Sequence, residues 1–479
     1  MPNTSKDRYG MTLSTSSPTA AERLQEGRDR LLSQNEGPET QFHEAIALDE
    51  AFAVAHGYLA FWYMQRARPE EARASAKHAL SLAPGITRRE RQQLEAISFW
   101  INGAASQALA RLKEHLSEFP RDALLMRLAH RLYALGCSGA GVANFPPEFL
   151  ALLQGVAPHC REDWAFLGEY AWAHHETGFL DEGMRLAQRS LELNPTNAVA
   201  THSVTHVYFE RGNASDGRDF LDNWLQGFDC PATSYVHLSW HLALFELALG
   251  RYQEALELYE NGVRPSVVAK SLVTLSDSAS LLWRLQLYGG TPPPKPWQEV
   301  RDLAAPAAEK SGAAFRDAHA ALAFAASGDQ DAIGKMMHRW RSAAEQGNLF
   351  AKEVVLPLVQ GIHAFAQGNY ADAAHLLEPV FPQMVRIGGS HAQREVFEDT
   401  LLEAYLRAEQ FDKAEDMLDT RLKRRGSVRD TFWLGRVQAG QGQGEQAQTS
   451  FEAATQGWQE GDAASPEMTN LNRLAAAVH

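Results

Sequence analysis

Apolar residues recur at intervals of three and four positions along almost the whole chain, and alternation at every second position is hard to find. Such spacing gathers apolar side chains on one face of an α-helix, so the pattern predicts an all-helical protein. The stretch between residues 164 and 259 shows it most clearly, because three consecutive helix pairs can be placed there.

Turn residues divide this pattern into repeated units. In residues 250–259, Gly250 permits a tight turn, Tyr252 fills the space between two helices, and the small Ala255 lets their backbones approach. The segments that begin at Gly178 and Gly212 lie 34 residues apart, which is the tetratricopeptide period. Further copies begin at or near Pro69, Gly103, Gly368, Phe411 and Gly442. We therefore predict an all-α tetratricopeptide-type α-solenoid, a right-handed superhelix of helix hairpins that can close around an interior pocket.

Composition suggests four segments. Residues 1–18 are rich in Ser and Thr, which predicts a flexible tail, and residues 289–296 are rich in Gly and Pro, which predicts a stiff connector. Between and after them we expect an N-terminal tetratricopeptide array over residues 19–288 and a C-terminal array over residues 297–479.

Charge and cysteine content narrow the choice of partners and compartment. The chain has 45 basic and 59 acidic residues, a net charge of −14, which argues against nucleic acid and anionic membranes as partners. Only Cys137, Cys160 and Cys230 occur, which is typical of a reducing compartment. No apolar run approaches the roughly 18 residues of a membrane helix, and no signal-peptide core is found. We expect a cytoplasmic protein without a membrane span, and its oligomeric state is left open.

Histidines cluster on the predicted first helices of two neighbouring repeats. His202, His206 and Glu210 recur every fourth residue, so a helix presents them on one face. They lie ten, six and two residues before Gly212, positions that face the concave groove in tetratricopeptide units. The next repeat offers His237 and His241. The same reasoning places two further aromatic side chains, Trp172 and Trp240, near the groove.

This pattern is compatible with several chemistries. Two imidazoles one helical turn apart can chelate a transition metal such as zinc, iron or copper, with Glu210 as an oxygen ligand. The metal candidates are thus His202, His206, Glu210, His237 and His241. A histidine can also act as a general acid or base, for which the candidates are His206, His241, Asp317 and His319. Alternatively, each histidine is a hydrogen-bonded packing residue, and the metalloprotease motif is absent.

Five short segments carry a more specific signal, in this order: Thr205-His206-Val207, His237 with 240–244, Asp277 with 280–285, 317–319 and 388–394. Together they resemble the family of tetratricopeptide repeat protein 38, over roughly residues 20–430. The resemblance implies a superhelical tetratricopeptide fold and a bacterial or eukaryotic cytoplasmic protein, and it brings no settled activity. It groups the polar residues His206, His237, His241, Asp277, Asp317, His319, His391 and Arg394.

Together these observations predict a binding protein with an interior pocket for a small polar or anionic ligand or a short peptide. Its ligand-binding residues would be Trp172, His202, His206, His237, Trp240, His241, His391 and Arg394. Two alternatives stay open, an enzyme that uses the clustered His and Asp residues and a scaffold with an open groove. The basic run of residues 421–425 is interpreted as a solvated helix end.

Overall fold

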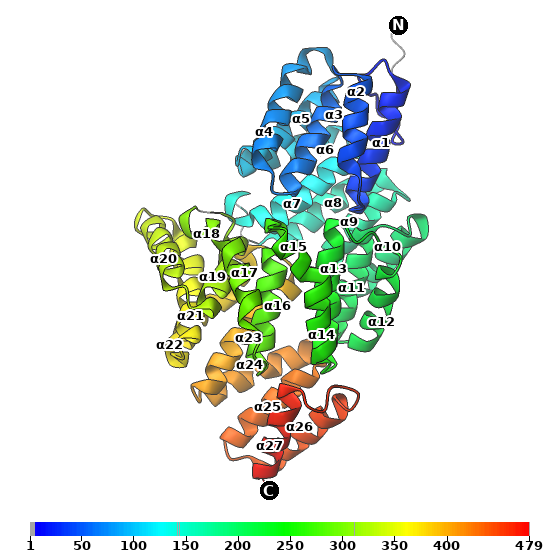
Figure 1. Ribbon diagram of the computed structural model, residues 1–479. Coiled ribbons are helices and arrows are strands. Elements are labelled where there is room, and N and C mark those ends of the chain that lie inside the picture. The colour runs from blue at the N-terminus through cyan, green and yellow to red at the C-terminus, as the bar shows by residue number, and fades with distance from the viewer. Residues whose placement is uncertain (1–4, 141, 143, 311, 479) are drawn as a thin grey trace. The chain divides into compact units, whose positions relative to one another are not determined.

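The computed structural model describes residues 5–140, 142, 144–310 and 312–478. Within these residues, the regular structure is helical apart from one isolated bridge between Lys6 and Thr12. Consecutive helices pair into hairpins (Figure 1), so the predicted all-α, tetratricopeptide-type repeat fold is confirmed. None of the described helices combines the length and the apolar character needed to cross a membrane.

The chain forms two compact units, and each is described by itself. The first unit comprises residues up to 204 and residues 228–235. It contains α1 to α10 and the beginning of α11. The helices are α1 (Pro18–Ser33), α2 (Pro38–Leu48), α3 (Ala53–Gln65), α4 (Pro69–Ser81), η1 (Ala83–Gly85), α5 (Arg88–Ile101), α6 (Ala105–Glu118), α7 (Ala123–Ala140), α8 (Phe145–Cys160), α9 (Trp164–His175), α10 (Leu180–Leu193) and α11 (Ala198–Arg211).

The second unit comprises residues 205–227 and 236–479. It contains the end of α11 and the helices from α12 onward, with α13 entering it at residue 236. These are α12 (Ala214–Leu225), α13 (Thr233–Ala248), α14 (Tyr252–Leu258), η2 (Tyr259–Val263), α15 (Arg264–Val268), η3 (Leu272–Thr274), α16 (Leu275–Leu287), α17 (Pro294–Ala304), α18 (Pro306–Glu309), α19 (Ala314–Ser327), α20 (Gln330–Glu345), η4 (Ala351–Val355), α21 (Leu356–Ala366), α22 (Tyr370–Leu377), η5 (Phe381–Ile387), α23 (His391–Arg407), α24 (Phe411–Arg424), α25 (Val428–Gly440), α26 (Gly444–Gly457) and α27 (Pro466–Val478).

The Pro-rich segment 289–296 lies within the second unit, and α17 begins inside it at Pro294. The compact units thus divide near residue 204 and not at this segment. The predicted division into repeat arrays 19–288 and 297–479 refers to runs of repeats along the sequence and not to compact units. It stays a prediction.

Residues 5–17, part of the predicted flexible tail 1–18, make specific contacts with α1. The Asp7 carboxylate forms an ion pair with Arg28 Nη1 at 2.8 Å, and both side chains are buried. Leu13 is buried as well, and Ser17 caps α1 by accepting a hydrogen bond from the Ala20 amide. A few buried side chains order this segment although most of its residues are small and polar, and composition alone does not reveal them. Residues 1–4 lie outside the described residues.

Glycines with positive φ form the turns between the paired helices, as the repeat pattern predicts. Gly178, Gly212, Gly250, Gly368 and Gly442 all have φ between 72° and 84°. In this region a side chain is strained, so glycine is the residue that the turn favours. Each turn is followed within two residues by the second helix of its hairpin.

The array of the second unit closes on itself, because its first hairpins contact its last helices. Trp458 Nε1 donates to the Ala248 carbonyl at 3.0 Å, and the Asp462 amide donates to the Gly250 carbonyl at 3.0 Å. The hydroxyl of Tyr252, on α14, donates to Glu467, on α27, at 2.5 Å. Segments about two hundred residues apart in sequence therefore lie side by side within this unit.

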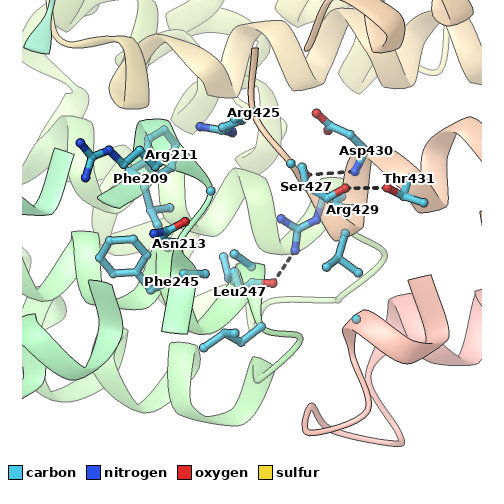
Figure 2. Close-up of a pocket in the computed structure, with 18 of the residues that line it drawn as sticks. Phe209, Arg211, Asn213, Phe245, Leu247, Arg425, Ser427, Arg429, Asp430 and Thr431 are labelled. Atoms are coloured by element: carbon cyan, nitrogen blue, oxygen red, sulfur yellow. Dashed lines mark hydrogen bonds between the residues drawn. The ribbon is translucent and has the colours of Figure 1, made fainter. Parts of the chain in front are cut away.

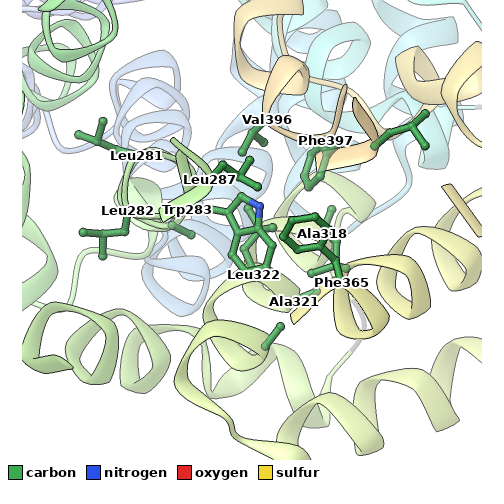
Figure 3. Close-up of a cluster of buried hydrophobic side chains, with 14 of the residues drawn as sticks. Leu281, Leu282, Trp283, Leu287, Ala318, Ala321, Leu322, Phe365, Val396 and Phe397 are labelled. Atoms are coloured by element: carbon green, nitrogen blue, oxygen red, sulfur yellow. The ribbon is translucent and has the colours of Figure 1, made fainter. Parts of the chain in front are cut away.

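Figure 3 shows part of the hydrophobic core of the second unit around Trp283 on α16. Its indole packs against Phe365 on α21, and its Nε1 donates to Thr400 Oγ1 on α23 at 2.9 Å. Val396 and Phe397 belong to the same core. This packing fixes α16 and α23, the helices that carry several of the polar residues described next.

Candidate functional site

Three of the predicted site histidines meet within the second unit. The ring of His241, on α13, lies 4.6 Å from that of His206, on α11, and 4.8 Å from that of His237, measured between ring centroids. Trp240 stacks on His237 at 5.3 Å. His206, Trp240 and His241 are buried, with at most 1% of each residue exposed. The structure thus brings these predicted residues together, and their rings pack on one another.

Helix α16 supplies polar partners to this cluster. Both carboxylate oxygens of Asp277 lie 3.1 Å from His237 Nδ1, and Trp240 Nε1 donates to Ser280 Oγ at 3.0 Å. The guanidinium of Arg284 lies 5.7 Å from the centre of the Trp240 ring. The carboxylate of Asp277 can fix the orientation and tautomer of the His237 imidazole, as carboxylates do for catalytic or metal-bound histidines.

His391, the first residue of α23, lies between two carboxylates. Its Nδ1 is 2.7 Å from Glu210 Oε1 and its Nε2 is 3.5 Å from Glu398 Oε1. Burial lowers the pKa of His391, but the two carboxylates outweigh it and raise this pKa to about 10. The pKa of Glu398 correspondingly falls to about 2, since the charged partners outweigh burial. His391 is therefore a fixed cation near neutral pH.

Arg394 contacts the turn that precedes its own helix. It donates through Nη1 to the Gly389 carbonyl, and its side chain is buried. In the same turn, Ser390 and Gln393 form a capping box, so each accepts a hydrogen bond from the backbone amide of the other. The amides of Ser390 and Gln393 are thus both used by side chains at the start of α23.

Asp317 and His319, two of the candidate acid–base residues, have structural partners on and near α19. Asp317 pairs with Arg316 at 3.1 Å and with Arg339 at 3.0 Å. His319 Nδ1 lies 2.7 Å from the Phe315 carbonyl oxygen, and its ring packs against Phe397. Burial lowers the pKa of His319 to about 4, so its imidazole is neutral at neutral pH.

Two predicted ligand-binding residues, Trp172 and His202, belong to the first unit. Trp172 is buried in an aromatic cluster of that unit, with ring centroids 4.1 Å from His130 and 5.8 Å from Phe149. Its position in the groove was deduced from the turn glycine, but the ring packs between helices α7, α8 and α9. His202 lies on α11, partly exposed.

A cavity of about 740 Å³ lies in the second unit, beside the residues described above (Figure 2). It is bordered by the ends of α11 and α13, by α16 and α23, and by the loop between α24 and α25. Five arginines line it, namely Arg211, Arg284, Arg421, Arg425 and Arg429. Its apolar lining includes Phe209, Leu244, Phe245, Leu247 and Val428.

Arg421 forms ion pairs with three carboxylates that line this cavity. Its three nitrogens Nε, Nη1 and Nη2 contact Asp430 at 2.9 Å, Asp399 at 2.8 Å and Glu395 at 3.1 Å. Burial opposes the charge, but the carboxylates raise the pKa of Arg421 well above its usual value. The interpretation of residues 421–425 as a solvated helix end is therefore wrong for Arg421, whose side chain is 5% exposed. The basic run itself is visible in the sequence. Its carboxylate partners come from other helices and reach Arg421 only in the folded structure.

No family model matches the chain. Among similar solved structures, a human IFIT1 dimer with PPP-AAAA has 14% identity and a TM-score of 0.39, covering 95% of this chain and 96% of that one. Yeast Tom70 has 12% identity and a TM-score of 0.30, covering 96% and 95%. A tetratricopeptide repeat protein from Parabacteroides merdae has 13% identity and a TM-score of 0.29, covering 65% and 98%.

The exclusion of nucleic acid as a partner is wrong. Human IFIT1, a helical-repeat chain among these similar structures, has been solved with the oligonucleotides PPP-AAAA and m7Gppp-AAAA. The exclusion rested on the net charge of −14, which is a sum over the whole chain. A negative sum does not prevent a local cluster of positive charge such as the five arginines of the cavity.

Proposed function

We propose that this protein is a tetratricopeptide-type binding protein that holds a small anionic ligand in the cavity of its second unit. The cavity itself carries this proposal: at about 740 Å³ it matches the size of small-molecule sites, and five arginines line it. Closure of the array on itself gives the cavity walls from both ends of the unit. A short peptide with a free carboxylate belongs to the same ligand class.

In this proposal the histidine cluster does not contact the ligand but lies behind the residues that line the cavity. Arg284 joins the two, because it lies over Trp240 and also borders the cavity. Glu395, another cavity residue, follows His391 and Arg394 on the same helix. The predicted residues His206, His237, Trp240, His241, His391 and Arg394 would therefore position the arginines and carboxylates that meet the ligand.

A thermal-shift screen with small carboxylates, phosphates and short acidic peptides, followed by calorimetry, tests this proposal. Ser215 lines the cavity and is exposed, so Ser215→Trp should block the cavity without disturbing the core. Asn223→Trp, on the exposed side of the same helix and away from the cavity, is the matched control. We expect loss of binding with Ser215→Trp alone. Equal binding by both variants would refute the cavity as the site.

A second candidate function is an enzyme that uses the histidines for acid–base or metal-dependent chemistry. The pairing of His237 with Asp277 favours it, since such pairs orient catalytic or metal-bound imidazoles. Metal analysis of protein prepared without a histidine tag tests it. A stoichiometric metal that is lost in the His206→Ala, His241→Ala double variant would support a metal site, and metal-free active protein would contradict it.

We further propose that the chain belongs to the family of tetratricopeptide repeat protein 38 and works in the cytoplasm. The polar motif residues that suggested the family all lie in the second unit, and several contact one another, which supports the proposal. Cys160 and Cys230 are free thiols, as a reducing compartment would allow. Fluorescence microscopy of a tagged chain checks the compartment, and a secreted product would contradict it.

A further inference from the structure

The lining of the second unit's cavity combines five arginines with several carboxylates. Three buried carboxylates line it, Glu395, Asp399 and Asp430, together with the exposed Asp216. Arg421 contacts all three buried carboxylates at once. Arg425 also pairs with Glu395, and Arg429 pairs with Glu467.

Two of these arginines keep a donor that the protein does not use. Arg284 donates through Nη2 to the Ala392 carbonyl at 2.7 Å, and Arg425 donates through Nη2 to Glu395. The Nη1 atom of each is buried and has no hydrogen-bond partner among the residues that the structure describes. A buried donor without a partner costs about 1–3 kcal/mol, more when charged. Both side chains border the cavity, so we infer that a small rotation of each would bring its Nη1 to a ligand there.

An apolar surface lies beside the arginines of the cavity. Figure 2 shows Phe209 and Phe245 on one side of the cavity and Arg429 on the other. The Arg425 guanidinium lies 4.2 Å from the centre of the Phe209 ring. Leu244 and Leu247 extend this apolar surface. A ligand with a flat apolar group can lie on it while its charged end faces the arginines.

Two helix N-termini add to the positive potential. The first residues of α12 and of α25 line the cavity, and both helices are longer than three turns. The amide dipoles of a helix place a partial positive charge at its N-terminus, which favours an anion there. This contribution reinforces the arginines and does not define the site by itself.

We propose, building on the function proposed above, that the ligand is an organic phosphate monoester with a flat apolar group. A phosphate monoester carries a charge of about −1.5 to −2 at pH 7 and has three strong acceptor oxygens. Its three oxygens are enough to accept from both Arg284 and Arg425, which line the cavity from different elements. A monocarboxylate has one charge and two oxygens, so it offers fewer acceptors to the two arginines.

Calorimetric titration with a matched series of probes tests the ligand class. The probes are phenyl phosphate, benzoate, benzyl alcohol and inorganic phosphate, which separate the charge from the ring. We expect phenyl phosphate to bind at least about tenfold more tightly than benzoate or inorganic phosphate, and benzyl alcohol not to bind. Equal or tighter binding of benzoate would overturn the phosphate assignment and leave the anion cavity in place. If phenyl phosphate does not bind, the assignment is also overturned.

Variants separate this inference from the broader proposal. Arg425→Gln should weaken phenyl phosphate binding about tenfold, and Arg425→Lys should weaken it less, because it keeps the charge without the planar fork. Lys423→Gln is the matched control, since Lys423 lies on the exposed side of the same helix end. Unchanged affinity in folded Arg425→Gln overturns the assignment of this residue. Binding that survives Ser215→Trp would instead refute the cavity itself, and with it the proposed function.

Discussion

At His391, burial and charge act in opposite directions on the pKa of the imidazole. Burial alone would keep the ring neutral, as it does for His319, whose pKa falls to about 4. The carboxylates of Glu210 and Glu398 reverse the direction and raise the pKa of His391 to about 10. His319 and His391, two histidines of the same unit, thus differ in charge near neutral pH because of their neighbours.

This difference predicts a pH dependence of stability. The pKa of His391 is about 10 in the fold and about 6.5 in an unfolded chain. Because the folded value is higher, its stabilisation is complete below about pH 6.5 and is lost as the pH rises toward 10. We expect the melting-temperature difference between the wild type and His391→Gln to be largest near pH 6 and small near pH 10. His338→Gln, at an exposed position, should show no such trend; a pH-independent difference for His391→Gln would contradict the assignment.

We expect the Arg421→Ala variant to lose much of its folding stability. Replacing it with Ala leaves Glu395, Asp399 and Asp430 buried without their shared counterion. Breaking a buried ion pair in this way costs about 3–5 kcal/mol. Thermal denaturation of Arg421→Ala should show it, whereas Lys423→Ala, on the exposed side, should stay within about 0.5 kcal/mol of the wild type. Equal stability of the two variants would show that the network contributes little.

At the residue scale, the sequence predicted which histidines meet but not which groups accompany them. The i,i+4 spacing was sufficient to place His237 and His241 together on α13. The partners Asp277 of His237 and Glu210 of His391 come from other helices. Spacing along one helix carries no information about such partners, and the same holds for the carboxylates around Arg421.

At the scale of elements, the turn between α11 and α12 is more constrained than the other repeat turns. Gly212 has φ of 72°, and a Cβ atom there would lie 2.4 Å from the Gly426 carbonyl oxygen. Gly426 belongs to the loop between α24 and α25, and both glycines line the cavity. Gly368 has φ of 79° in the equivalent turn between α21 and α22, and a Cβ atom there would have nothing within 4 Å.

Comparing Gly212→Ala with Gly368→Ala isolates this contact. Both changes place alanine in the left-handed region, at a cost of about 1–2 kcal/mol. Only Gly212→Ala also forces the loop at Gly426 to move. We expect it to lower the melting temperature more than Gly368→Ala does and to weaken phenyl phosphate binding, whereas Gly368→Ala leaves binding unchanged. Similar effects of both substitutions on stability and binding would argue against a close contact.

The sequence predicted most of the elements because apolar period and turn glycines are local signals. Residues 5–17 carry no repeat signature, and their contacts come from the Asp7–Arg28 ion pair and the burial of Leu13. The run 421–425 was placed correctly near the end of a helix. Its burial depends on α23 and α25, which local pattern does not reveal.

At the scale of the whole molecule, the second unit holds its two ends together through a buried polar cluster. Glu467 on α27 accepts from Tyr252 on α14 and pairs with Arg429, which also donates to the Leu247 carbonyl. Arg429 borders the cavity, so closure and site share a residue. The sequence allowed a closed solenoid, but whether the ends meet depends on curvature that accumulates over many repeats and has no local signature.

Glu467→Ala should therefore loosen closure and weaken binding together. Removing the carboxylate leaves Tyr252 and Arg429 without their shared acceptor. We expect faster hydrogen exchange in both α13–α14 and α25–α27, and weaker binding of phenyl phosphate. Glu460→Ala, at a highly exposed position of the same region, serves as the control. Faster exchange confined to α27 would show that the two ends are not coupled through this cluster.

The most direct measurement is a crystal structure of the protein with phenyl phosphate. The cavity account predicts difference density for the phosphate between the side chains of Arg284 and Arg425, with the ring toward Phe209 and Phe245. Density among His206, His237 and His241 instead, or a cavity that stays empty at saturating ligand, would contradict it.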